Sequence, residues 1–105
     1  MKLYFSHYLN THVELTEERE RHIQNKHPDL LPEFRSELIL TIASPDQVRI
    51  SKRMAHAKLF SKWFDDIRMG KHVVVVVMCE ENRNWVLTAY LSRKRTMGEL
   101  EWPIT

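Results

Sequence analysis

A chain of 105 residues has room for one domain with a single hydrophobic core, and not for two. Apolar residues make up 43% of the chain and only two residues are glycine, which excludes a disordered or low-complexity protein. The formal net charge of +2 is too small to indicate nucleic-acid binding by itself. The local cluster Arg93-Lys94-Arg95 is a better indication, and we expect one domain over residues 1–105.

The cysteine content and the apolar runs bear on the compartment. Cys79 is the only cysteine, so no disulfide can form within one chain, which fits a reducing environment. The first eight residues lack the long apolar stretch of a secretory signal. The apolar run from Val73 to Met78 is too short to cross a bilayer. We therefore expect a cytoplasmic protein without membrane association.

The N-terminal half predicts two helices. Residues 1–14 alternate between apolar and polar types and are expected to form short strands or an extension. Thr16 is a favourable N-cap, and Pro28 disfavours helical backbone before it, so a helix is expected from Glu17 to Lys26. A second helix should begin at Pro32 and end at Ser44-Pro45-Asp46. Its apolar stripe consists of Leu31, Phe34, Leu38 and Ile42.

Beyond residue 46 the apolar period changes to two, which predicts strands. The β-branched run from Lys71 to Cys79 should be a central strand buried on both faces. The other strands are expected at Val48–Ile50, Leu59–Phe64 and Trp85–Arg93, with Leu100 and Trp102 as a short edge. Residues 15–102 would then form an α+β core in which two N-terminal helices pack on a four-stranded antiparallel β-meander.

Alternation assigns the side chains of the strand 85–93 to two faces. The face packed against the helices should carry Trp85, Leu87, Ala89 and Leu91, and the other face Val86, Thr88, Tyr90 and Ser92. The hydroxyls on the second face have two interpretations, a solvated sheet surface or donors to a phosphate. Lys62, between Phe60 and Phe64 on the neighbouring strand, is either a phosphate contact beside stacked bases or a lysine whose stem covers apolar surface.

The segment from Arg21 to Pro28 holds two histidines and two cations within eight residues. Histidine has the unperturbed pKa nearest neutrality, so this group suits proton transfer and anion binding. His22 and Lys26 share a helix face, and His27 lies at the helix end.

Metal and cofactor sites are not expected. His7 and His12 are five residues apart, as are His22 and His27, which matches no common zinc spacing. With only two glycines the chain cannot build a phosphate-binding glycine loop.

Three segments taken together resemble a group of small nucleases. They are Arg21–Asp29, the stretch Ile42–Val48 with its Ser-Pro-Asp, and Leu87-Thr88-Ala89-Tyr90. The group comprises phage and bacterial nuclease domains of the barnase, colicin-type tRNase and RelE-like kind, and the resemblance covers Leu15 to Trp102. It implies a metal-independent endoribonuclease, often a toxin or a phage or mobile-element protein, with RNA as substrate and an antitoxin or immunity protein as partner.

By this resemblance the catalytic candidates are His22, His27, Thr88 and Tyr90. The candidates for binding RNA phosphate are Lys26, Lys62 and Arg93. Such an enzyme uses the 2′-OH of RNA as nucleophile and leaves a 2′,3′-cyclic phosphate, so DNA should survive. The sequence leaves open which histidine is the base and which the acid.

Two other functions fit the same sequence. The domain could be a catalytically silent module that binds RNA or a protein. It could also be an interaction protein that forms a homodimer through a sheet edge, near Val48–Ser51 or at the C-terminal tail.

Overall fold

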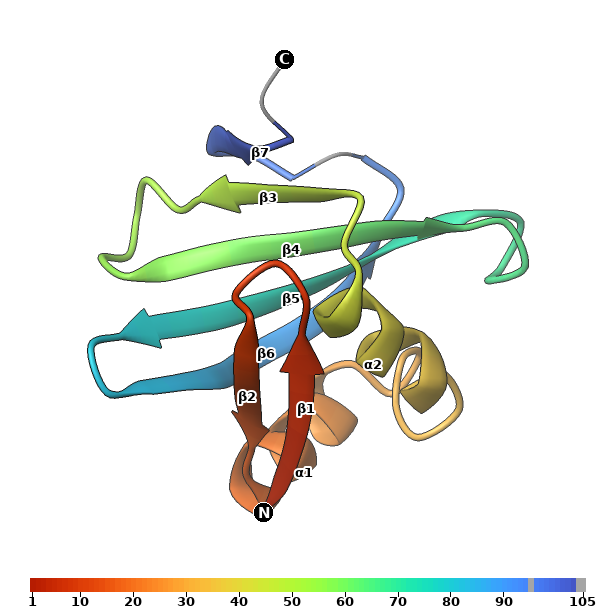
Figure 1. The fold of residues 1–105 in the computed structure, drawn as a ribbon. Helices are drawn as coiled ribbons and strands as arrows, with labels where there is room; N and C mark the ends of the chain where they lie inside the picture. The colour runs from red at the N-terminus through yellow and green to blue at the C-terminus, as the bar shows by residue number, and fades with distance from the viewer. Residues whose placement is uncertain (95, 104–105) are drawn as a thin grey trace.

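The computed structural model of the protein describes residues 1–94 and 96–103. In that part of the chain two helices and seven strands form an α+β domain (Figure 1). The elements are, in chain order, β1 (Lys2–Ser6), β2 (Thr11–Leu15), α1 (Glu17–Lys26), α2 (Arg35–Ala43), β3 (Gln47–Ile50), β4 (Ala57–Phe64), β5 (Lys71–Glu80), β6 (Arg83–Ser92) and β7 (Glu99–Trp102). The strands form a single sheet in the order β1-β2-β6-β5-β4-β3-β7.

The predicted four-stranded antiparallel meander is wrong, because strands are added at both edges. Residues 1–14 form the short strands that were one of the two expectations, and not an extension: β1 and β2 pair, and β2 joins β6 as a parallel neighbour through Glu14 and Trp85. The two helices therefore follow a hairpin. At the other edge β7 pairs with β3, so the segment Val48–Ser51 is not an open edge, and the C-terminal strand with Leu100 and Trp102 is the edge strand, as the second alternative expected.

Helix α1 has the predicted bounds. The hydroxyl of Thr16 accepts a hydrogen bond from the backbone N–H of Arg19 at 3.1 Å, and glutamates occupy the first turn. The helix ends at His27, whose N–H donates to the Ile23 carbonyl at 2.7 Å. Helix α2 begins at Arg35 rather than at Pro32, because residues 28–34 form turns instead.

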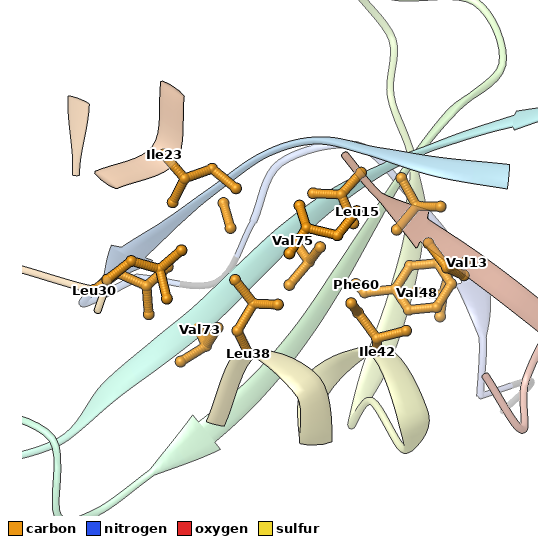
Figure 2. Packing of buried hydrophobic residues seen from close by; sticks show 14 of the residues in the cluster. Val13, Leu15, Ile23, Leu30, Leu38, Ile42, Val48, Phe60, Val73 and Val75 are labelled. Atoms are coloured by element: carbon orange, nitrogen blue, oxygen red, sulfur yellow. The ribbon is translucent and has the colours of Figure 1, made fainter. Parts of the chain in front are cut away.

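The core lies between the helices and one face of the sheet (Figure 2). Phe60 of β4 is completely buried there, and Leu38 and Ile42 of α2 pack in the same cluster. The side chains of Val74 and Val76 on the opposite face are 0% and 9% exposed, so β5 is buried on both faces as predicted. On that second face, Met97 and Gly98 of the crossover from β6 to β7 line a cavity together with Leu59 and Tyr90.

A β-bulge in strand β6 alters the predicted alternation of its side chains. Thr88 pairs with Val76, but Val77 pairs with Val86, so Leu87 is the extra residue. The bulge moves Val86 into the core and puts Trp85 in register with Met78 on the opposite face, which corrects both assignments. The Leu87 carbonyl accepts a hydrogen bond from the Arg19 guanidinium at 3.2 Å, which ties α1 to the bulge.

Two partly buried carboxylates should make the domain sensitive to acid. Burial raises the pKa of Glu101, but hydrogen bonds from Lys58 and Tyr8 outweigh it, so the pKa lies below its ordinary value. The pKa of Glu20 is lowered in the same way by Arg35 and Lys2. A folded-state pKa below the unfolded value contributes stability above the unfolded pKa, and that stability is lost as pH falls through the folded pKa.

We expect the urea midpoint of the wild type to fall as the pH drops through the ordinary range of glutamate. A double variant with Glu20→Gln and Glu101→Gln should be less stable at neutral pH and should lose less on acidification, as measured by circular dichroism. Glu33→Gln, at an exposed glutamate, is the control and should keep the wild-type slope. An equally steep fall in the double variant would contradict this assignment.

Candidate active site

The sheet face away from the helices carries polar side chains among apolar ones. Cross-strand partners project from the same side of a sheet, so the pairings define which side chains meet there. One row consists of Arg49, Leu59, Val76 and Thr88, and the next of Gln47, Ser61, Val74 and Tyr90. The hydroxyls of Thr88 and Tyr90 therefore lie on the face opposite the core, as the alternation predicted.

A cavity of about 500 Å³ opens on this face beside the crossover from β6 to β7. Its lining residues are Ser51, Lys52, Arg53, Leu59, Tyr90, Met97 and Gly98. The cavity is thus bounded by a basic loop after β3 on one side and by the crossover on another. It combines an apolar floor, a phenol and two cationic residues, which is a composition suited to a nucleotide.

Gly98 allows the crossover to lie close to β3. Its φ of +113° is disfavoured for other residues, and a Cβ there would lie 2.5 Å from the carbonyl oxygen of Ile50. The Gly98 carbonyl accepts a hydrogen bond from Arg49 Nη1 at 2.9 Å. These contacts fix the crossover against the sheet and so set the width of the cavity.

The ring of His27 lies next to the ring of Tyr90. The ring centroids are 5.9 Å apart, and the ring planes are inclined by 40°. The backbone of His27 is held at the end of α1, since its N–H donates to Ile23 and its carbonyl accepts from Leu30 at 3.0 Å. Two residues that are 63 positions apart in sequence are therefore brought together by the packing of α1 on β6.

The environment of Tyr90 keeps its hydroxyl protonated. Burial raises the pKa of Tyr90 above its ordinary value, so at neutral pH the phenol is a hydrogen-bond donor.

The hydroxyl of Thr88, two residues earlier, is buried and has no hydrogen-bond partner in the described part of the chain. A buried hydroxyl without a partner is uncommon, and a ligand or an ordered water would satisfy it.

His22 and the flanking cations occupy other positions around α1 and β6. His22 is partly buried one turn after Glu18, whose pKa is lowered first by Arg19 and less by His22. No ring contact joins His22 to Tyr90 within residues 1–94 and 96–103. Lys26 and Arg93 are exposed, at the end of α1 and directly after β6. Arg95, the third member of the basic cluster, lies outside the described residues.

Lys62 is not brought to this site. It is in register with Val73, on the side of the sheet that faces the core. Its ammonium group donates to the Ser44 carbonyl at 2.8 Å and lies 3.4 Å from the Asp46 carboxylate. The ammonium therefore has partners on the helix side and is not aimed at Tyr90.

The sequence analysis missed two residues of the cavity, Lys52 and Arg53. They form a basic pair directly after a predicted strand, which was the available signal. They line the same cavity as Tyr90 although β3 and β6 are separated by two other strands. No local pattern in the sequence indicates this association.

Comparison with known proteins adds no identification. No family model, curated protein or solved structure matches this chain. Among the described residues no group of three or more His, Cys, Asp or Glu side chains could hold a metal ion. None of the described helices combines the length and apolar character needed to span a membrane.

Proposed function

We propose that this protein is a metal-independent endoribonuclease that cleaves RNA by attack of the 2′-OH on the adjacent phosphate. The observation that carries the proposal is the contact between His27 and Tyr90 beside a cavity with basic residues. It places an imidazole beside a protonated phenol, with ring centroids 5.9 Å apart, so that both could act on one phosphate. The bond from phosphorus to the 5′-oxygen breaks, and the product is a 2′,3′-cyclic phosphate.

The roles follow from the chemistry of each group. RNA provides the nucleophile, so the protein must remove the 2′-OH proton and return a proton to the leaving 5′-oxygen. We assign a proton-transfer role to His27, and to Tyr90 donation of its O–H to the phosphate or the leaving oxygen. Each acid–base role contributes roughly 10²–10⁴-fold in rate.

Cations around the cavity supply the electrostatic part of the mechanism. Lys52 and Arg53 line the cavity, and Lys26 and Arg93 are exposed on the two elements that carry His27 and Tyr90. Preorganised positive charge stabilises the phosphorane as negative charge develops on it. In this proposal Lys52 and Arg53 take the place of Lys62 as phosphate contacts, and Lys26 and Arg93 are kept from the sequence-based prediction.

The proposal predicts cleavage of single-stranded RNA in excess EDTA, with 2′,3′-cyclic phosphate ends and no cleavage of a DNA strand of the same sequence. The reason is that the nucleophile belongs to the substrate and no step uses a metal. Mass spectrometry of the products distinguishes cyclic from linear phosphates. Cleavage that requires added Mg²⁺, or cleavage of the DNA strand, would contradict the proposal.

We also propose the cytoplasm as the compartment and RNA as the partner. Burial raises the pKa of Cys79, so the thiol of this lone cysteine stays protonated, which suits a reducing compartment. Because the resemblance to toxin nucleases implies a neutralising partner, we propose an antitoxin or immunity protein that covers the cavity. The same face could instead bind RNA without cleaving it, which the EDTA assay would reveal as binding without products.

A further inference from the structure

We propose that a second pocket on the same sheet face binds one unpaired purine base of the RNA and so sets a sequence preference. This inference rests on the proposed function. The pocket has a volume of about 360 Å³ and lies beside β4. Its lining residues are Asp46, Gln47, Ser61, Trp63 and His72.

Trp63 provides a fixed aromatic surface in this pocket. Its side chain is 42% exposed although it lies on an interior strand of the sheet. The indole N–H donates to Asp65 at 2.6 Å, and the ring packs on Gly70, where a Cβ would lie 2.5 Å from Cζ2. The His72 ring meets it edge-to-face at 4.9 Å. An exposed indole whose orientation is fixed by contacts with Asp65, Gly70 and His72 can stack on a base with little loss of side-chain entropy.

The polar groups beside Trp63 suit a base edge better than a phosphate. The Asp46 carboxylate accepts from the Trp63 backbone N–H at 2.8 Å, and the nearby Lys62 ammonium partly compensates its charge. A carboxylate repels a phosphate but accepts hydrogen bonds from the exocyclic amine of a base. The Gln47 side chain accepts from Arg49 Nε at 3.3 Å, and its amide nitrogen has no partner within the described residues. An amide donor next to a carboxylate acceptor can read a purine that carries both kinds of group.

The position of this pocket relative to Tyr90 fits one RNA strand. Gln47, Ser61, Val74 and Tyr90 are partners in one cross-strand row, so Gln47 and Tyr90 are three interstrand steps apart, or about 14 Å. The two middle members of the row, Ser61 and Val74, are buried. An RNA strand that passes over the side chains covering them would place a phosphate at Tyr90 and a nearby base on Trp63. The larger stacking area of purines favours them over pyrimidines at Trp63.

The test uses hexanucleotides of 2′-O-methyl adenosine and 2′-O-methyl uridine, which cannot be cleaved because the nucleophile is blocked. With Trp85→Phe and Trp102→Phe as background, Trp63 is the only indole and its fluorescence reports the pocket directly. We expect the adenosine oligomer to quench it and to bind more tightly than the uridine oligomer. In the otherwise wild-type protein Trp63→Ala should weaken adenosine binding about tenfold, as for the loss of one stacked base, and Trp63→Phe should weaken it less.

Trp102→Ala is the matched control, because Trp102 is 38% exposed but in register with Val48, on the core side of the sheet. It should leave adenosine binding unchanged. Unquenched Trp63 fluorescence, or equal affinities of the wild type and the folded Trp63→Ala variant, would overturn the inference. Because these oligomers are not cleaved, failure of the ribonuclease proposal appears separately, as an absence of products from natural RNA while purine binding persists.

Discussion

Replacing His27 by alanine is expected to lower the rate of RNA cleavage by roughly 10²–10⁴-fold, the contribution of one acid–base group. The reason is its position: the centroid of the His27 ring lies 5.9 Å from that of Tyr90, and Tyr90 lines the cavity. The measurement is kcat/KM on a short RNA in EDTA. Binding of an uncleavable RNA should change little, because the loss lies in the transition state.

His22→Ala is the matched control for that variant. The two histidines are on the same short segment, but His22 has no ring contact with Tyr90 among the described residues. The variant should therefore keep most of the activity. If His22→Ala abolished cleavage and His27→Ala left it intact, the assignment of the proton-transfer role would be wrong.

Replacing Phe60 by alanine is expected to destabilise the domain by roughly 3–5 kcal/mol, because Phe60 is completely buried in the core. A loss of that size is a large share of the roughly 5–15 kcal/mol that holds a small domain folded. Urea unfolding followed by circular dichroism measures it.

Trp63→Ala, three residues further along β4, tests the same strand on its opposite face. The Trp63 side chain is 42% exposed, so its removal should cost clearly less than the removal of Phe60. Equal losses of unfolding free energy at the two positions would contradict the placement of Phe60 and Trp63 on opposite faces of β4.

Local signals predicted much of the fold. The bounds of α1 were readable because a capping threonine, acidic residues and a proline act within a few positions of the helix ends. The two-sided burial of β5 followed from its run of valines. Neither signal depends on the distant parts of the chain.

The order of the strands could not be predicted in this way. The parallel pairing of β2 with β6 has one register pair, Glu14 and Trp85, and no periodicity marks it. The bulge at Leu87 is stabilised by Arg19 from a different element, so alternation alone misplaced Val86. These features depend on tertiary contacts that override local patterns.

The candidate site was predictable to a similar degree. Tyr90 was assigned to the correct sheet face because that part of β6 lies beyond the bulge. His27 lies at the end of α1, as expected from the predicted bounds of that helix. Lys62 was a poor candidate because its register with Val73 directs it to the helix side. Lys52 and Arg53 required knowledge of the crossover that forms the cavity.

A double-mutant cycle of His27→Ala and Tyr90→Phe, measured as kcat/KM for RNA cleavage in EDTA, tests most directly whether these two residues act on one phosphate. Groups that act as a unit in one transition state are strongly non-additive. We predict that each single variant is impaired and that the double variant is little worse than the more impaired single one. Two effects that multiply independently, or a wild type that leaves RNA uncut, would contradict a shared ribonuclease site.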